Sequence, residues 1–311
     1  TFLTNLLFSR KSIMKNLPIE IIKANITKNR RLTAKKQYVI SSEVHVKKGI
    51  RLVIDDGVTI LIQNGKKERL RLKRAAFIFD QGSSLRAKKF QIKACDQNNK
   101  PIKYPDNGGL WFVGNYRSAG KDTVKVKANR RLSASSFKAE CITTHYLGRF
   151  DPLKETSRTK VVQDDIDGIS VLGVGPTEWQ ISEIQSFYSA DDGFDLTNSH
   201  ILLEKVRIQT PTEDGINLSS SYLEILKSLT INATKTSTKD RDIFDFETDN
   251  GPSILALHSK CKLNIQGVFG DQINLSSSDM PKPNTKDDNE RKYKFKGALI
   301  KAAMIYSIDK D

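Results

Sequence analysis

Residues 164–221 decide the fold, and they read DDIDGISVLGVG (164–175), WQISEIQSFYSADDGFDLTNS (179–199) and HILLEKVRIQTPTEDGINLSSS (200–221). Short runs of alternating apolar residues meet at junctions of an acidic residue, a glycine and a bulky apolar residue. Alternation with period two is typical of β-strands, and Asp-Gly is typical of turns because glycine tolerates positive φ. The junctions lie 25 and 22 residues apart, at Asp167-Gly168-Ile169, Asp192-Gly193-Phe194 and Asp214-Gly215-Ile216.

A strand-turn unit that recurs at such a period is typical of a solenoid, in which stacked units share one continuous core. The repeat returns at 242–246 (DIFDF) and at 271–278 (DQINLSSS), and the second of these nearly copies 214–221. Serine runs such as 219–221 are expected to form turn ladders rather than nucleophiles. We therefore predict an all-β chain that forms a single right-handed parallel β-helix.

The predicted β-helix covers residues 21–278. Residues 1–20 place apolar side chains, Phe2, Leu3, Leu6 and Leu7 among them, at helical spacing, which predicts a short N-terminal helix that caps the first coil. Residues 279–311 begin as a polar, proline-containing loop and end in GALIKAAMIYSI (297–308), a capping segment that fits either a strand or a helix.

Charge is divided unevenly along the chain. Residues 1–160 carry 35 Lys and Arg against 12 Asp and Glu, a net charge of +23, whereas residues 161–311 carry 16 against 24, a net charge of −8. Because sequence order is axial order in a β-helix, we expect a rod that is basic at one end and acidic at the other. Such asymmetry favours a polyanionic partner at the basic end, although lysines that only keep the strands soluble are the alternative.

The N-terminal half resembles the opening coils of large secreted, lipoprotein-like bacterial β-helix proteins of the pectin-lyase-like fold. The resemblance covers about residues 21–225 and implies a β-helix and an extracellular or cell-surface location, but no particular activity. The segments that carry it are Asn25-Ile26-Thr27, Leu32-Thr33-Ala34, Val44-His45-Val46, Leu52-Val53-Ile54, Gly108-Gly109-Leu110-Trp111, and Gly173-Val174-Gly175 through Ser189-Ala190-Asp191-Asp192-Gly193-Phe194.

An acidic column is the strongest candidate for chemistry. If the repeat keeps its register, Asp167, Asp192 and Asp214 lie on one corner of successive coils, about 4.8 Å apart. Carboxylates at that distance repel unless something intervenes. Ca²⁺ held by Asp167, Asp192, Asp195 and Asp214 would do so, as would a shared proton that made Asp191, Asp192 and Asp214 a catalytic centre. The alternative we favour is that the aspartates are ordinary turn residues, each neutralised singly by neighbouring backbone N–H groups and by Arg or Lys.

Catalysis by this column would parallel pectin-cleaving glycoside hydrolases, in which paired carboxylates protonate the leaving oxygen and activate water. Those enzymes also carry Gly-His-Gly and Arg-Ile-Lys, and neither tripeptide occurs here. A lyase would need Ca²⁺ and a basic residue, and Arg241 alone stands within the turn pattern of the acidic half. The sequence therefore leaves enzymatic activity open and favours its absence.

A basic run from Lys66 to Arg74 alternates Arg with Leu, as a strand with one cationic face would. Stacked on cations of the next coil, it would form a positive sheet that suits an acidic polysaccharide, or less well the phosphates of nucleic acid. The aromatic residues nearby, Phe77, Phe79 and Phe90, alternate toward the core and are unavailable for base stacking. The predicted contacts are Lys66, Lys67, Arg69, Arg71, Lys73, Arg74, Arg86, Lys88 and Lys89.

Binding of an anionic polymer is therefore the function that we predict from the sequence. Cleavage of a polysaccharide by the carboxylate cluster is the first alternative, and a structural or nucleic-acid-binding module is the second. No apolar run approaches the roughly 18 residues of a transmembrane helix. A chain that begins without Met is expected to be a processed form or part of a longer protein, and a cytoplasmic location stays open.

Overall fold

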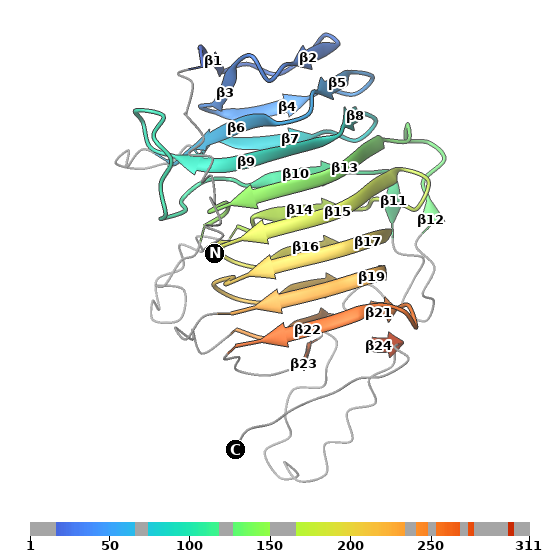
Figure 1. Cartoon of the computed structure of the whole chain (residues 1–311). Helices are drawn as coiled ribbons and strands as arrows, with labels where there is room; N and C mark the ends of the chain where they lie inside the picture. Colours follow the sequence, from blue (N-terminus) through green and yellow to red (C-terminus); the bar gives the residue numbers. More distant parts are fainter. Residues whose placement is uncertain are drawn as a thin grey trace, which may run out of the picture.

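The computed structural model describes residues 17–65, 74–117, 127–149, 166–233, 241–247, 253–267, 273–276 and 298–301, and every regular element in these ranges is a β-strand. Figure 1 shows the strands stacked as successive coils of one parallel β-helix. The strands form a 14-stranded sheet, an 8-stranded sheet and a small hairpin. No helix that could cross a membrane is found in the described ranges.

Along its main path the 14-stranded sheet contains β1 (Ile19–Ile22), β3 (Gln37–Ile40), β6 (Val58–Gln63), β9 (Lys89–Cys95), β13 (Ser136–His145), β15 (Trp179–Phe187), β17 (His200–Gln209), β19 (Tyr222–Asn232), β21 (Ser253–Leu257) and β24 (Ala298–Lys301). Beside this path lie β2 (Arg30–Leu32), β5 (Arg51–Ile54), β8 (Ser84–Ala87) and β22 (Lys262–Gln266).

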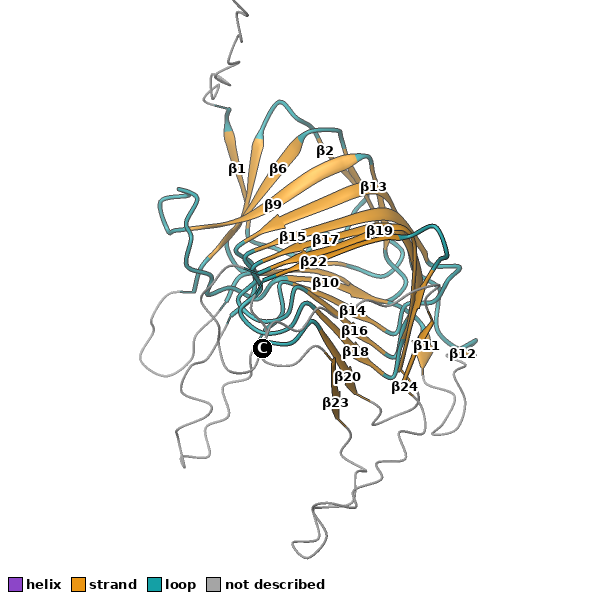
Figure 2. Ribbon diagram, turned by 60° about the horizontal axis from the view of Figure 1, so that its bottom comes forward, coloured by secondary structure: helices purple, strands orange, loops and turns teal. Residues whose placement is uncertain are grey.

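The 8-stranded sheet contains only short strands, namely β4 (Glu43–Val46), β7 (Ala76–Phe79), β10 (Leu110–Val113), β14 (Ile169–Leu172), β16 (Phe194–Thr197), β18 (Ile216–Ser219), β20 (Phe244–Glu247) and β23 (Ile273–Ser276). The antiparallel hairpin joins β11 (Tyr116–Arg117) to β12 (Lys127–Ala128). Figure 2 shows the long strands on one side of the rod and the short strands on the other.

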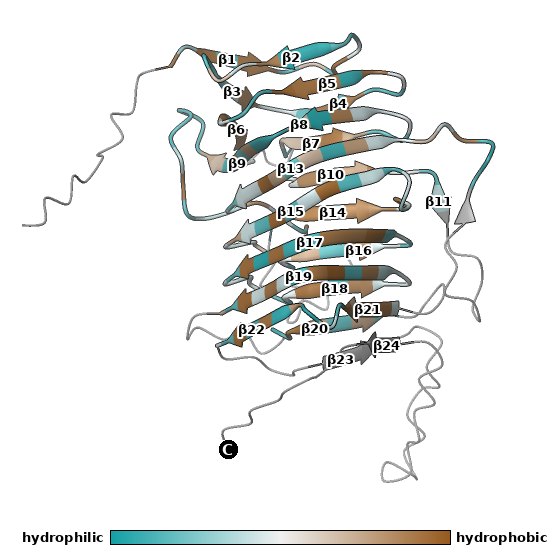
Figure 3. Ribbon diagram, turned by 45° about the vertical axis from the view of Figure 1, so that its right-hand side comes forward, coloured by the Kyte–Doolittle hydropathy of each residue, from teal (hydrophilic) through white to brown (hydrophobic). Residues whose placement is uncertain are grey.

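The core lies between the two sheets and is made by the alternation that the sequence predicts. Figure 3 shows polar and apolar residues alternating along the strands. Phe77, Phe79 and Phe112 are fully buried, and the Phe79 and Phe112 rings stack with their centroids 5.1 Å apart. Phe90 is buried as well, so the predicted inward direction of Phe77, Phe79 and Phe90 is confirmed. Burial of such large side chains is the main stabilising contribution to the stack.

Internal serines hold the turn between the short and the long strands. The Ser221 hydroxyl donates to the carbonyls of Leu196 and Ser219, both at 2.9 Å, and it accepts from the Ser199 N–H at 2.9 Å. Ser253 repeats the arrangement one coil later by donating to the Leu218 carbonyl at 2.7 Å. These hydroxyls satisfy buried backbone groups, which confirms that the 219–221 serine run forms a turn ladder.

The N-terminal end of the β-helix differs from the prediction, and the C-terminal end shows one of the two predicted alternatives. Residues 19–22 form β1, which pairs in parallel with β3, so the predicted helix over 1–20 is wrong where it reaches the described residues. The β-branched residues Ile19, Ile21 and Ile22 favour a strand, and pairing with β3 satisfies their backbone. Residues 1–16 lie outside the described ranges. At the other end, residues 298–301 form β24 against β21, so the closing segment supplies a strand.

Close contact between coils makes Gly109 a sensitive position. Its φ is +68°, and a Cβ there would lie 2.3 Å from the Asp167 carbonyl oxygen of the next coil. Gly57 has a similar φ of +74° but no heavy atom within 4 Å of an added Cβ. Gly57→Ala should therefore cost about 1–2 kcal/mol of left-handed strain, and Gly109→Ala at least about 2 kcal/mol more because the coils must separate.

Guanidinium unfolding of the two variants measures this difference. Equal losses of unfolding free energy at Gly57 and Gly109 would show that the packing of the next coil on Gly109 does not contribute to stability.

Candidate functional site

The acidic residues gather where the chain enters the 8-stranded sheet. We call this group the acidic corner, and it consists of Asp167, Asp191, Asp192, Glu213, Asp214 and Asp242, which precede β14, β16, β18 and β20. The pairing of Ser170 with Asp195, Asp195 with Asn217 and Asn217 with Asp245 fixes the register of these coils. Counted back by three residues, that register aligns Asp167, Asp192, Asp214 and Asp242 in one column, as the sequence predicts for the first three.

Backbone N–H groups bind the carboxylates of the acidic corner from coil to coil. The Asp214 N–H donates to Oδ1 of Asp192 at 3.0 Å, and the Asp242 N–H donates to Oδ1 of Asp214 at 2.7 Å. At the start of the column, the Ser170 hydroxyl donates to Oδ2 of Asp167 at 3.0 Å. The aspartates therefore act as turn residues, and each of these bonds stabilises one oxygen of a carboxyl group.

Burial and mutual repulsion keep protons on this corner. Burial raises the pKa of Asp167 to about 6 and the pKa of Asp214 to about 8. Burial, together with the neighbouring charges of Asp167, Asp214 and Asp191, raises the pKa of Asp192 well above its usual value. A hydrogen bond from Ser170 limits the rise of the Asp167 pKa. The corner thus holds carboxyl groups of different acidity side by side, as acid–base catalysis requires.

Three carboxyl groups of the corner converge closely enough to share a cation. Single oxygens of Asp191, Asp192 and Glu213 all lie within 4.8 Å of one another. Hard oxygen donors of this kind suit Ca²⁺. Of the residues predicted for Ca²⁺, Asp192 belongs to this group, whereas Glu213 was missed. Register is the signal that finds it, because Glu213 precedes Asp214 as Asp191 precedes Asp192.

A second polar column lies on the outer face of the 8-stranded sheet. Phe194 and Leu196 point into the core, so Asp195 between them faces outward, and Asn217 and Asp245 occupy the equivalent positions on β18 and β20. Burial raises the pKa of Asp245 to about 7. Oδ1 of Asn217 and Oδ1 of Asp245 are buried and accept no hydrogen bond. Acceptors in that state call for water, a hydroxyl group or a cation.

Arg241 lies at the C-terminal end of the corner. Its side chain is 3% exposed, and it directly precedes Asp242 in the coil that follows Glu213 and Asp214. Burial lowers its pKa. The structure therefore places the basic residue singled out in the sequence directly beside Asp242 of the acidic corner.

The predicted polyanion contacts separate into three groups. Lys66, Lys67, Arg69, Arg71 and Lys73 lie outside the described residues. Exposed side chains on β8, on β9 and in the turn between them form a second group, Arg86, Lys88 and Lys89.

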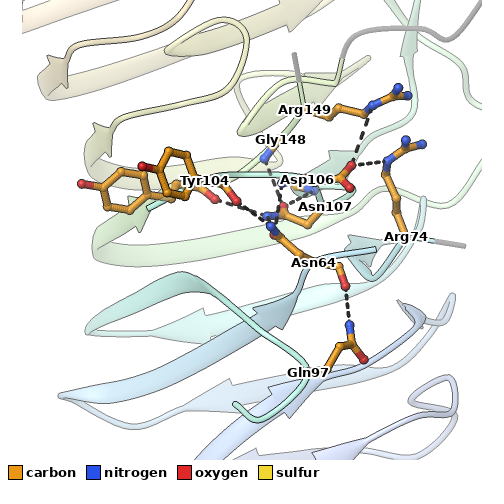
Figure 4. A network of polar contacts seen from close by, with 10 residues as sticks. Asn64, Arg74, Gln97, Tyr104, Asp106, Asn107, Gly148 and Arg149 are labelled. Atoms are coloured by element: carbon orange, nitrogen blue, oxygen red, sulfur yellow. Dashed lines mark hydrogen bonds and ion pairs between the residues drawn. The ribbon is translucent and has the colours of Figure 1, made fainter. Parts of the chain in front are cut away.

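Arg74 lies apart from both groups. Its Nε donates to Oδ1 of Asp106 at 3.0 Å, and Nε of Arg149 approaches the same oxygen at 3.8 Å (Figure 4). The Arg74 side chain is only 15% exposed, so it holds the loop before β10 in place and is not part of an open cationic surface.

Replacement of Asp214 by Asn tests the electrostatics of the corner. Because the pKa of Asp214 is raised in the folded state, the folded state binds a proton more tightly than the unfolded state does. The stability that this proton contributes is fully present below about pH 4 and is lost as the pH rises toward 8. We expect the wild-type melting temperature in EDTA to fall between pH 5 and pH 8. Asp214→Asn should raise it at pH 8 by at least about 2 °C and weaken the pH dependence. Asp56→Asn, at an exposed turn, is the control; equal effects of the two variants would contradict this electrostatic assignment.

Comparison with known proteins identifies the family of the chain. The family model for the pectate-lyase like beta helix domain matches residues 24–273, which is most of the 311 residues. No curated protein and no solved structure matches the chain. The matched domain supports a carbohydrate-related role and agrees with the parallel stacking of the strands described above. This chain belongs to the family of pectate-lyase-like β-helix domains.

Proposed function

We propose that this protein binds an acidic polysaccharide through a band of cations on the 14-stranded sheet. We call Arg86, Lys88, Lys89 and Lys93 the basic band; the first three are exposed and Lys93 is half-buried. Within the described part of the chain, none of the four has an ion-pair partner. An array of unpaired cations on an open sheet suits a polymer that carries regularly spaced carboxylates or sulfates.

The pairing of strands adds to this argument. Arg86 on β8 lies directly opposite the exposed Lys138 on β13. Like charges that face each other across two strands are unfavourable, so an anion between them would be stabilising. Farther along β13, His145 lies opposite Lys93, which is on β9. Burial and Lys93 lower the pKa of His145 to about 4, so that imidazole is neutral at neutral pH.

The ligand class follows from what surrounds the band. Phe77, Phe79 and Phe90 are packed in the core, so none of these three rings is available to stack on a base of single-stranded nucleic acid. The family of the chain supports a carbohydrate-related role. An acidic polysaccharide satisfies both constraints.

Retention on immobilised polygalacturonate or heparin tests the proposal. Lys88→Gln with Lys89→Gln should weaken binding about fivefold to tenfold and reduce its salt dependence, because fewer counterions are released. Lys262→Gln is a matched control, since Lys262 is exposed on the outward face of the same sheet but lies outside the band. Equal retention of the band variant and wild type, or equal weakening by Lys262→Gln, would contradict the proposal.

Cleavage of the bound polymer at the acidic corner is a second candidate function. The observation that favours it is the difference in acidity between Asp167, with a pKa of about 6, and Asp214, with a pKa of about 8. At neutral pH the first can accept a proton and the second can donate one, as glycoside cleavage requires. Ca²⁺ held by Asp191, Asp192 and Glu213 would attract a substrate carboxylate and reduce the repulsion in the corner.

The activity is measured as new reducing ends, or as absorbance of unsaturated products, from polygalacturonate with and without Ca²⁺. Asp214→Asn, which removes the proposed proton donor, should lower it at least about 100-fold while retention on the polymer persists. Glu43→Gln, at an exposed position on β4 outside both the corner and the basic band, should leave it unchanged. If wild type forms no product from polygalacturonate under either condition, cleavage of this substrate class is excluded and the binding proposal stands alone.

A further inference from the structure

One loop presents an aromatic side chain almost entirely to solvent. It runs from Asp96 to Asn107, between β9 and β10, and Tyr104 in it is 84% exposed. Among the described residues the next most exposed large hydrophobic side chain is Ile19, at 50%. Figure 1 shows the loop projecting from the rod on the side where β9 ends. An isolated exposed aromatic residue is common on protein surfaces, so its support has to decide whether it matters.

Asn64 fixes the far end of the loop. Its Nδ2 donates to the Tyr104 carbonyl, and its Oδ1 accepts from the Asp106 N–H at 3.1 Å and from Nδ2 of Asn107 at 3.2 Å (Figure 4). The Gly65 N–H also donates to the Asp106 carbonyl, at 2.7 Å. The backbone on both sides of Tyr104 is thus held to the end of β6.

The near end of the loop is fixed as well. Oδ1 of Asp96 accepts from the N–H groups of Asn98 and Lys100, both at 2.8 Å. Nε2 of Gln63 donates to Oδ1 of Asn99 at 2.8 Å, and the N–H of Ile102 donates to the Ala94 carbonyl at 3.2 Å. Hydrogen bonds of these kinds hold a turn in one conformation.

The backbone of this loop is fixed by hydrogen bonds while the ring of Tyr104 stays exposed to solvent. A preorganised loop with an exposed aromatic ring is typical of a binding site. Little conformational entropy is lost when a ligand meets a ring whose backbone is already fixed. Tyrosine is favoured at such contacts because it offers a large rigid surface with few rotatable bonds. The ring of Tyr104 makes no contact that would explain its position within the described residues, whereas its backbone is bound on both sides.

The charge of the loop points to an anionic ligand. Lys100 and Lys103 are exposed on either side of the turn that leads to Tyr104. The two acidic residues of the loop are engaged within the protein, Asp96 with backbone N–H groups and Asp106 with Arg74 and Arg149. The outer surface of the loop is therefore basic and aromatic.

The position of the loop links the basic band to the acidic corner. Lys89 and Lys93 lie on β9, and the chain passes from β9 directly into the loop. At the other end of the loop, Asn107 immediately precedes Gly108, whose N–H donates to the Ala75 carbonyl. The next strand, β10, pairs in register with β14. Counted back along that register, Asn107 occupies the place that Asp191 occupies in the acidic corner. The loop thus connects the strand that carries Lys89 and Lys93 to the strand that pairs with β14 beside the acidic corner.

We propose that the loop 96–107 is a second contact for the acidic polysaccharide, in which the ring of Tyr104 packs against the apolar face of a sugar and Lys100 and Lys103 contact acidic groups. Sugar rings have an apolar face that packs on aromatic side chains, and their carboxylates or sulfates pair with lysine. The inference rests on the proposed binding of an acidic polysaccharide, and it adds a second contact site that contains no residue of the basic band.

Affinity electrophoresis in gels that contain polygalacturonate measures the contribution of the loop. Tyr104→Ala should weaken binding about tenfold, whereas Tyr104→Phe should stay within about twofold of wild type because the ring and not the hydroxyl makes the contact. Tyr104→Trp should bind within about twofold as well, and its added emission should shift to shorter wavelength as polymer saturates the protein. Lys100→Gln with Lys103→Gln should weaken binding and lower its salt dependence.

Leu202→Ala is the matched control, since Leu202 is an exposed apolar residue at 42% on β17, away from the loop. Far-ultraviolet circular dichroism and melting temperature establish that each variant is folded. Wild-type affinity of Tyr104→Ala, with no shift in the emission of Tyr104→Trp, would overturn the inference and leave the proposed function intact. Absence of polygalacturonate binding by wild type would overturn both.

Discussion

Parallel pairing in register forces chemically equivalent residues of successive coils to lie about 4.8 Å apart. For apolar residues this spacing is favourable, and the stack of Phe79 on Phe112 with centroids 5.1 Å apart is one result. For internal serines it is favourable as well, because each hydroxyl reaches the backbone of its neighbour. For residues of like charge the same spacing causes electrostatic repulsion, which has to be relieved at every coil.

The two halves of the rod solve that problem differently. In the acidic half, backbone N–H groups take one oxygen of Asp192 and of Asp214, and burial favours the protonated form of what remains. In the basic half, Arg86 and Lys138 face each other on an open sheet, where water and counterions screen them. In the basic half the like charges stay unpaired in the free protein, and that is the physical reason to expect an anionic partner there.

Much of this architecture could be predicted from the sequence because it is local. The Asp-Gly-apolar junctions fix turn and strand together, and one common register then follows for all of them. The N-terminal segment was mispredicted because the spacing of its apolar residues fits a helix, while pairing of Ile19–Ile22 with β3, a contact distant in sequence, determines its structure. Glu213 and Tyr104 could not be found for a similar reason. Glu213 matters only through its register with Asp191, and the support for Tyr104 comes from Asn64, which lies 40 residues away.

Variable spacing between paired strands has a consequence for how such a chain can change over time. Equivalent positions on β10 and β14 are 59 residues apart, those on β14 and β16 are 25 apart, and those on β16 and β18 are 22 apart, yet all pair in register. Insertions between strands are therefore absorbed outside the ladder and leave neighbouring rungs undisturbed. Because the cost of closing a longer loop grows only slowly with its length, the periphery is free to diversify and acquire new recognition while the framework is inherited intact.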